Sequence, residues 1–317
     1  MTEQEQKPGS GAKQGVPFRE AAARFYDDNY IKLLVIPIAV IIAAVVVLLL
    51  SYSRTGSFFQ RDISLSGGLS VSAVSGFNDD IALEKELSQR FPGNDISVRK
   101  LTQLGGSVGL VVEANMQSRE EIDSLLGYLE GKLGIKRTDF TVQSVGASLG
   151  QSFFMQMLKG LLIAFVFMAL TVFVYFKVVS GRWLWLPGLF VVWTAFVDIL
   201  CTLAVVTFSG MHVSAAGLAA FLMLIGYSVD TDILLTVRAL KGVEARLPDR
   251  IRSAMKTGVM MSLTAFGAVI AGYFFAQSET VKQIMFILSA GMIFDIIHTW
   301  LTNACLLRWY LEKKGIA

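Results

Sequence analysis

Long apolar runs without charge constrain this chain more than any other feature of its sequence. Residues 33–50 read LLVIPIAVIIAAVVVLLL and contain no charged side chain. About 20 apolar residues in a row span the hydrocarbon core of a bilayer as one helix. Five further runs of this kind follow in the second half of the chain. Only 17% of the 317 residues are charged, whereas soluble domains average about 25%. The sequence therefore predicts a membrane α-helical bundle with six transmembrane helices.

The predicted organisation places one aqueous domain between the first and second transmembrane helices. The first 17 residues are polar and show no periodic pattern, which is typical of a disordered segment. The first apolar run is longer than that of a signal peptide and is interpreted as an uncleaved anchor. The expected segments are a cytoplasmic N-terminal segment (1–30), helix 1 (31–50), an extracytoplasmic domain (51–154), helices 2–6 within 155–308 (155–176, 183–208, 214–237, 258–276, 283–306) and a cytoplasmic tail (309–317).

Residues 51–154 alternate strand and helix patterns. Period-two or β-rich stretches predict four strands, and helical patterns follow the first and the third of them. Ser118 and Glu121 have the spacing of a capping box that opens the second helix. The order β-α-β-β-α-β predicts an α+β, ferredoxin-like domain. The stretches are, in chain order, 69–74, the helix from Asp80, 95–101, 108–114, the helix 119–133 and 139–145.

Basic residues predict the orientation of the bundle in the membrane. Lys and Arg are frequent in the N-terminal segment, in the turn 177–182, in the loop 238–256 and in the tail. The opposite turns, 209–213 and 277–282, carry only Lys282. Cytoplasmic loops hold the excess of Lys and Arg, so both termini are expected in the cytoplasm and residues 51–154 outside the cell membrane.

Composition excludes several other classes of function. A net charge of +3 is too small to indicate a nucleic-acid partner. Cys201 and Cys305 lie in apolar runs and belong to no CxxC or Cys/His cluster, so no metal site or redox centre is expected. The sequence contains no P-loop and no Ser-His-Asp arrangement. We therefore expect neither an enzyme nor a bound cofactor.

Ionisable side chains inside the apolar runs are the candidate functional residues. They are Asp198, Asp230, Asp232, Asp295 and His298. A carboxylate at the bilayer centre costs about 2.5–3.5 kcal/mol on insertion scales, so such residues usually face a protein interior. Asp230 and Asp232 lie on opposite faces of a helix, so either one faces the bundle interior and the other a neighbouring subunit, or the helix is locally irregular. Asp295 and His298 share a face and are expected to form a proton-exchanging pair. The alternative is that the acids only bond the helices together.

Several motifs resemble those of one family. GYSVDTDILLTVRALK (226–241), the later IRSAMKTGVMMSLTA (251–265), VGASLG (145–150) and VDIL (197–200) look like SecF, a subunit of the SecD–SecF protein-export complex in the resistance-nodulation-division superfamily. VDTD and Asp295 resemble its archaeal branch. SLSGG (64–68) resembles the family's DFTGG and lacks its acid.

The resemblance implies a function and a set of partners. It implies a SecD subunit, the Sec translocon channel, a translocating or inserting polypeptide and membrane lipid as partners. In the bacterial relatives, proton movement through the membrane acids drives motion of the exported domain; the resemblance leaves open whether proton flow drives this chain. Gly226, Tyr227 and Ser228 belong to the family motif, and Asp230 is the first candidate for the titrating acid. Lys256 matches the position of a basic residue that is Arg in bacterial relatives.

Two alternatives stay open at this point. A half-transporter of the resistance-nodulation-division type would export a small molecule or lipid with the same helix plan. An intramembrane aspartyl protease would use Asp198 and Asp230, but the sequence before Asp230 lacks the second glycine of the GxGD motif.

Overall fold

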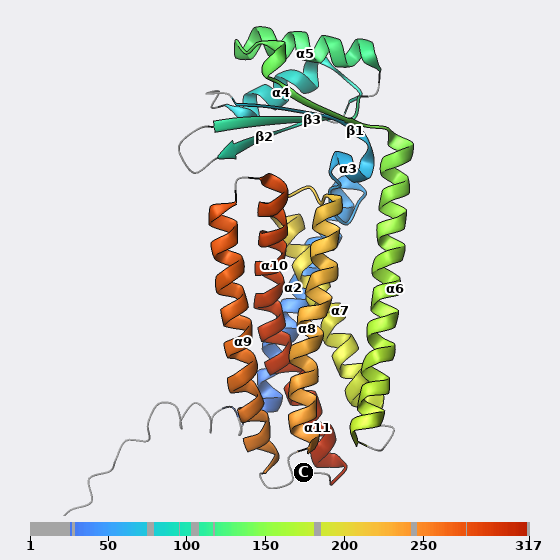
Figure 1. Cartoon of the computed structure of the whole chain (residues 1–317), viewed down its shortest axis with the longest axis vertical. Helices are drawn as coiled ribbons and strands as arrows, with labels where there is room; N and C mark the ends of the chain where they lie inside the picture. Colours follow the sequence, from blue (N-terminus) through green and yellow to red (C-terminus); the bar gives the residue numbers. More distant parts are fainter. Residues whose placement is uncertain are drawn as a thin grey trace, which may run out of the picture.

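The molecule is a helical bundle with a small α/β domain at one end (Figure 1). The computed structural model describes residue 26 and residues 29–74, 79–94, 96–102, 108–116, 118–180, 185–241, 246–276 and 278–315. Within these ranges, six helices are long and apolar enough to cross a membrane. The segment predicted to be disordered lies outside the described residues.

One four-stranded antiparallel sheet forms the centre of the α/β domain. The strands stand in the order β2-β3-β1-β4, and all neighbours are antiparallel. Helices α4 and α5 lie on the face that points away from the bundle (Figure 1). Strands and helices follow one another as β-α-β-β-α-β. Their bounds are β1 (Gly68–Val74), α4 (Asp80–Arg90), β2 (Ile96–Thr102), β3 (Val108–Ala114), α5 (Arg119–Leu133) and β4 (Thr141–Val145), with a short η1 (Arg137–Asp139) before β4.

Apolar and polar side chains alternate along the strands, so one face of the sheet is apolar and the other is polar. Side chains of one face form a core with α4 and α5, and burial of each such leucine is worth about 1.5–3 kcal/mol. The side chain of Asp79 caps α4 by accepting a hydrogen bond from the Ala82 amide at 3.1 Å. The predicted capping box is wrong, because Ser118 precedes α5 without a side-chain capping bond. The core includes Leu69, Val71, Leu83, Leu87, Leu110, Val112, Leu125 and Leu129.

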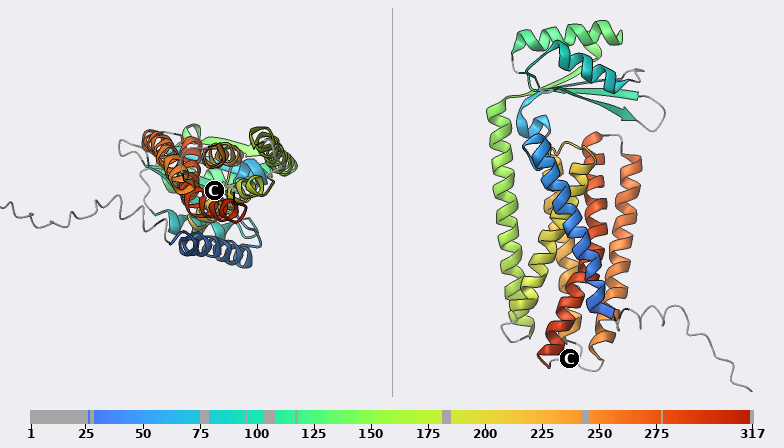
Figure 2. Two further views of the ribbon diagram at one scale, coloured as in Figure 1. Left: turned by 90° about the horizontal axis from the view of Figure 1, so that it is seen from below. Right: turned by 180° about the vertical axis from the view of Figure 1, so that it is seen from behind.

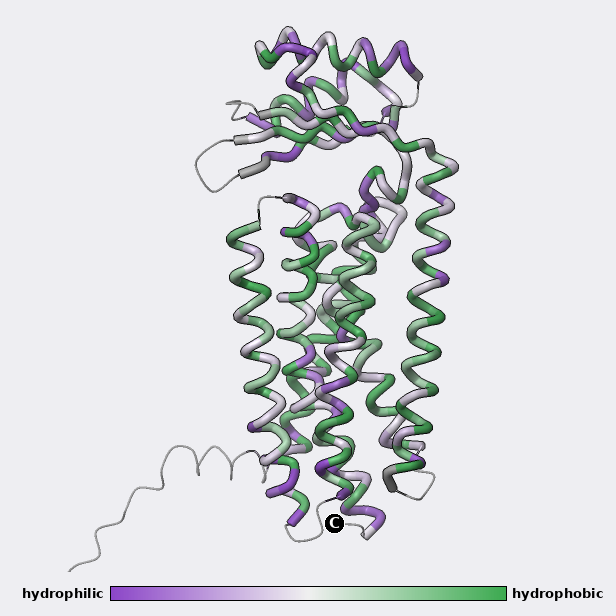
Figure 3. The backbone as a smooth tube through the Cα atoms, viewed as in Figure 1, coloured by the Kyte–Doolittle hydropathy of each residue, from purple (hydrophilic) through white to green (hydrophobic). Residues whose placement is uncertain are grey.

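Six long helices make up the bundle, and α8 packs against four of the others, α6, α7, α9 and α10. Helix α2 crosses the bundle obliquely and packs on α7 (Figure 2). The helices are hydrophobic along most of their length and more hydrophilic at the end opposite the α/β domain (Figure 3). Their bounds are α2 (Val35–Thr55), α6 (Ala147–Ser180), α7 (Trp185–Phe208), α8 (Ala215–Lys241), α9 (Leu247–Phe275) and α10 (Glu279–Ile297), which continues through the π-helix η2 (His298–Asn303) into α11 (Ala304–Lys313).

Glycines make the junction between bundle and domain. A short helix, α3 (Ile63–Ser66), ends at Gly67, and Gly67 and Gly68 have φ of 78° and 132°. Residues with a Cβ rarely adopt such backbone conformations, whereas glycine does so readily. A Cβ on Gly67 would overlap the backbone of Ala147 at the start of α6, and a Cβ on Gly150 would overlap the backbone of Gly67. The SLSGG stretch thus lets α3 lie directly against α6.

Candidate functional site

Buried polar side chains gather where α7, α8 and the α10–η2 segment meet. Such a cluster is unusual inside an apolar bundle, since buried polar groups cost free energy unless they are hydrogen-bonded. Three carboxylates and one imidazole lie in it, each at most 3% exposed. Its members are Asp198 on α7, Ser228, Thr231 and Asp232 on α8, Asp295 on α10, and His298, Thr299 and Asn303 on η2.

Helix geometry decides which part of the GYSVDTD motif enters the cluster. Ser228, Thr231 and Asp232 are spaced by three and four residues and share the inward face of α8. Tyr227 and Asp230 are exposed on the outward face. Asp230 therefore lies outside the cluster, and Asp232 is the carboxylate of this helix that lies inside it.

Asp198 is bonded through both of its carboxylate oxygens. The Ser228 hydroxyl donates to Oδ2 at 2.6 Å, and Nδ1 of His298 lies 2.7 Å from Oδ1. Asp198 and His298 are both fully buried. The predicted pair of Asp295 with His298 is wrong, since the imidazole turns to α7 and joins it to η2.

Asp232 and Asp295 share one hydroxyl. Thr299 Oγ1 lies 2.9 Å from Asp232 Oδ1 and 3.3 Å from Asp295 Oδ1. The Asn303 amide also donates to Asp232 Oδ1 at 2.7 Å, and Thr231 donates to Asp295 at 3.1 Å. A hydroxyl has a single hydrogen, so Thr299 donates to one acid and can accept from the other when that acid is protonated. This carboxylate–hydroxyl–carboxylate chain can exchange a proton between α8 and α10.

The π-helix η2 positions the partners on the C-terminal side of the cluster. In an α-helix every fourth residue advances by about 40° around the axis, so residues at 295, 299 and 303 would drift apart. The wider turn of a π-helix counters this drift, and π-bulges occur frequently at functional sites. Asp295, Thr299 and Asn303 consequently all face α8.

Further bonding capacity remains inside the cluster. Within the described residues, Asp232 Oδ2, His298 Nε2 and Asn303 Oδ1 are buried and make no hydrogen bond. An unpaired buried polar group costs about 1–3 kcal/mol. These three atoms therefore keep unused hydrogen-bonding capacity inside the cluster. Among the described residues, no group of three or more His, Cys, Asp or Glu has metal-binding geometry.

The remaining residues singled out from the sequence lie outside the cluster. Lys256 is exposed on α9, and Gly226 and Tyr227 lie on the outward face of α8. An intramembrane aspartyl protease needs two facing acids, whereas Asp198 points inward and Asp230 outward. Sequence reasoning missed Thr231, Thr299 and Asn303 as ligands of the acids. The spacing of four between Asp295, Thr299 and Asn303 is the signal that points to the last two.

Bundle, domain and cluster together define the class of protein. It is a multi-pass membrane protein with a folded domain after its first membrane helix and a buried acid cluster that links three helices.

Comparison with known proteins identifies the family. Residues 130–313 match the family "Protein export membrane protein SecD/SecF, C-terminal". The chain is 33% identical to the protein-export membrane protein SecF of Pyrococcus furiosus, covering 89% of this chain and 92% of that protein. It is 30% identical to SecF of Methanolacinia petrolearia, covering 92% and 98%. The chain belongs to the SecD/SecF family of protein-export membrane proteins.

Solved structures show the same fold. The chain superposes on the crystal structure of SecDF, a translocon-associated membrane protein from Thermus thermophilus, with a TM-score of 0.69 at 16% identity. The match covers 97% of this chain and 40% of that one, so the chain spans less than half of SecDF. A second SecDF structure, in a super-membrane-facing form, matches with a TM-score of 0.53 and 17% identity. The relatives are named protein-export membrane proteins, and these names do not favour a small-molecule exporter.

Proposed function

We propose that the chain is the SecF-type subunit of a SecD–SecF complex, which assists the Sec translocon as polypeptides cross or enter the cell membrane. The observation that carries the proposal is the cluster of buried acids on α7, α8 and α10, in which Thr299 joins Asp232 to Asp295 and His298 bonds Asp198. A carboxylate that changes its charge in such a site favours a different helix arrangement in each state. Proton passage through the cluster thereby moves the helices and, with them, the attached domain.

The topology of the proposal has both termini in the cytoplasm and the α/β domain outside. The basic residues at the end of α8 and the start of α9 support it, because these helix ends lie at the opposite end of the bundle from the α/β domain (Figure 1). Two of these arginines bond the two helix ends to each other. Arg238 donates to the Ser253 carbonyl at 2.9 Å, and Arg250 donates to the Ala239 carbonyl at 2.8 Å.

A ferredoxin-like assignment of the α/β domain belongs to the same proposal. Four antiparallel strands in the order β2-β3-β1-β4, with both helices on one face, support this assignment.

Asp230 is assigned to the contact with SecD. It is exposed and continues a stripe of exposed positions on α8 that includes Ala219, Met223 and Tyr227. A carboxylate at membrane depth is costly against lipid, so a partner helix is expected to cover it. The inward acid and the outward acid of one motif then have separate roles, Asp232 in coupling and Asp230 in assembly.

The two roles are separated by matched substitutions two residues apart. With the chromosomal copy replaced by a variant, secretion of a signal-bearing reporter is measured together with co-purification of the SecD-type partner. We expect Asp232→Asn to keep the partner and lose export, because Asn retains the bonds from Thr299 and Asn303 but not the charge. We expect Asp230→Leu to lose the partner. Export at the wild-type level by Asp232→Asn would overturn the coupling role of Asp232. Full recovery of the partner with Asp230→Leu would overturn the assembly role of Asp230.

A further inference from the structure

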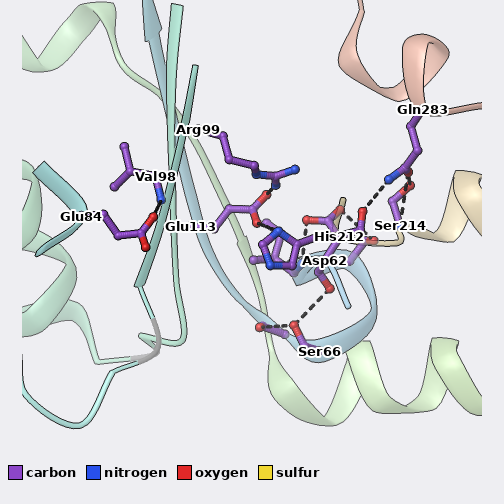
Figure 4. Close-up of polar contacts among 12 residues, drawn as sticks. Asp62, Ser66, Glu84, Val98, Arg99, Glu113, His212, Ser214 and Gln283 are labelled. Carbon is purple, nitrogen blue, oxygen red and sulfur yellow. Dashed lines mark hydrogen bonds and ion pairs between the residues drawn. The ribbon is translucent and has the colours of Figure 1, made fainter. Parts of the chain in front are cut away.

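An acid–base cluster bridges the polar face of the sheet and the end of the bundle. Glu113 on β3 pairs with Arg99 on β2, and its Oε2 lies 3.6 Å from Nδ1 of His212 in the loop between α7 and α8. Asp62, the N-cap of α3, lies close enough to accept a hydrogen bond from protonated Glu113. Figure 4 shows Arg99 and Glu113 on the side of the sheet that faces His212 and Asp62.

The bundle side of this contact is held firmly in place. The Val213 amide donates to the Gln60 carbonyl at 2.8 Å, and the Asp62 amide donates to the Val213 carbonyl at 3.0 Å. The Gln283 side chain of α10 bonds both the His212 carbonyl and Ser214. Asp62 and His212 therefore form a fixed platform for Glu113.

Among the described residues, no apolar cluster joins the α/β domain to the bundle. The apolar core of the domain draws its described members from residues 69–140 and shares none with the apolar clusters of the bundle. Two cavities, of about 640 Å³ and 550 Å³, flank the bridge, and both are lined by Arg99, Glu113 and His212. Regions with few buried apolar contacts are the ones that open locally.

The charges of the bridge do not balance without a proton. Glu113 and Asp62 supply two negative charges, and Arg99 supplies one fixed positive charge. Burial raises the pKa of Glu113 to about 7, Arg99 opposes this rise, and the negative charge of Asp62 adds to it. One proton, on Glu113 or on His212, makes the bridge neutral. Other charged groups on the cavity walls are Arg61, Glu84, Lys100, Glu279 and Lys282, of which Lys282 pairs with Glu279 and Lys100 with Asp80.

We propose that this bridge is a proton-dependent latch, which holds the α/β domain closed on the bundle and releases it as the surrounding solution becomes alkaline. When the domain lifts, Glu113 returns to water and its pKa to the usual range. Closing thus takes up one proton, so the closed state is favoured most at acid pH. This preference weakens as pH rises and is gone above about pH 7. A change of two to three pKa units corresponds to a roughly 300-fold change in the closing equilibrium. The latch does not depend on the proposed role of the intramembrane acids.

The test follows the domain position in the purified full chain in lipid nanodiscs. Cysteines introduced at exposed Ser124 on α5 and Phe275 at the end of α9 carry a donor and an acceptor dye. The chain without introduced cysteines reports any labelling of the buried Cys201 and Cys305. Between pH 5 and pH 9 we expect energy transfer to fall as the domain opens. Constant energy transfer over this range would overturn the proposal.

Variants of the bridge separate the latch from general effects of pH. Glu113→Gln mimics the protonated acid and is expected to stay closed at every pH. Asp62→Asn removes one negative charge and still caps α3, so the pH profile is expected to move toward acid, while the burial of Glu113 is unchanged. Glu279→Gln, on the wall of the same cleft, is the matched control and keeps the wild-type profile. A wild-type profile in both Glu113→Gln and Asp62→Asn would refute the latch.

Discussion

Removing the imidazole of His298 tests the geometry of the buried cluster. His298 and Asp198 are fully buried and lie 2.7 Å apart. Replacing His298 with Leu leaves the Asp198 carboxylate with the Ser228 hydroxyl as its remaining side-chain partner. Leaving a buried hydrogen-bonding group without its partner costs about 1–3 kcal/mol, and more when the group is charged. At roughly 2–4 °C per kcal/mol, the value for domains of 150–250 residues, Tm is expected to fall by about 5–10 °C.

A double-mutant cycle makes this prediction specific to the pair. Tm is measured by tryptophan fluorescence in detergent for His298→Leu, Asp198→Val and the double variant. Replacing both partners of a buried hydrogen bond by apolar groups can be nearly neutral, so the double variant is expected to be more stable than His298→Leu alone. The described pairing would be refuted if the loss of stability in the double variant equalled the sum of the two single losses. It would also be refuted if His298→Leu were as stable as the wild type.

Three further substitutions test separate parts of the structure. Gly67→Ala places a Cβ at positive φ against the backbone of α6 and is expected to cost about 1–3 kcal/mol; an unchanged denaturation midpoint would count against the glycine junction. Gln283→Ala removes the bonds to the loop before α8, so hydrogen exchange of residues 209–214 is expected to quicken, whereas unchanged protection would contradict the platform role. Gly258→Val overlaps the Trp300 ring and is expected to cost about 1–3 kcal/mol and to shift the Trp300 emission spectrum; an unchanged spectrum would speak against this packing.

Periodicity alone predicts most of the architecture. The six apolar runs and the strand and helix patterns of the domain correspond to elements of the structure, because burial in lipid or in a core imposes these periods on the sequence. Helix ends are less predictable. Helix α6 begins at Ala147, ahead of the predicted span at 155, because the helix continues beyond its apolar run.

The composition of the site is partly readable from the sequence, and its pairing is not. Asp198, Asp295 and His298 are recognisable from their rarity in apolar runs. The partners of each depend on which helix faces which, and local spacing carries no such information. The π-helix at His298–Asn303 is likewise set by tertiary contacts, and it changes the face on which Asn303 lies.

The two aspartates of the VDTD stretch show the limit of reasoning by resemblance. Register with the family motif favours Asp230, whereas burial assigns the interior position to Asp232. Helical spacing alone requires that the two acids point in different directions. Only the packing of α8 against α7 and α10 decides which one points inward.

Proton flux through the reconstituted complex tests the central claim most directly. The chain and its SecD-type partner are incorporated into liposomes with an enclosed pH-sensitive dye, and a pH gradient is applied. We predict that Asp232→Asn abolishes the flux seen with the wild-type complex. Under the same conditions, Asp232→Glu, which restores a carboxylate, is expected to retain part of it. Undiminished flux through the Asp232→Asn complex would contradict the assignment of the buried cluster as the coupling site.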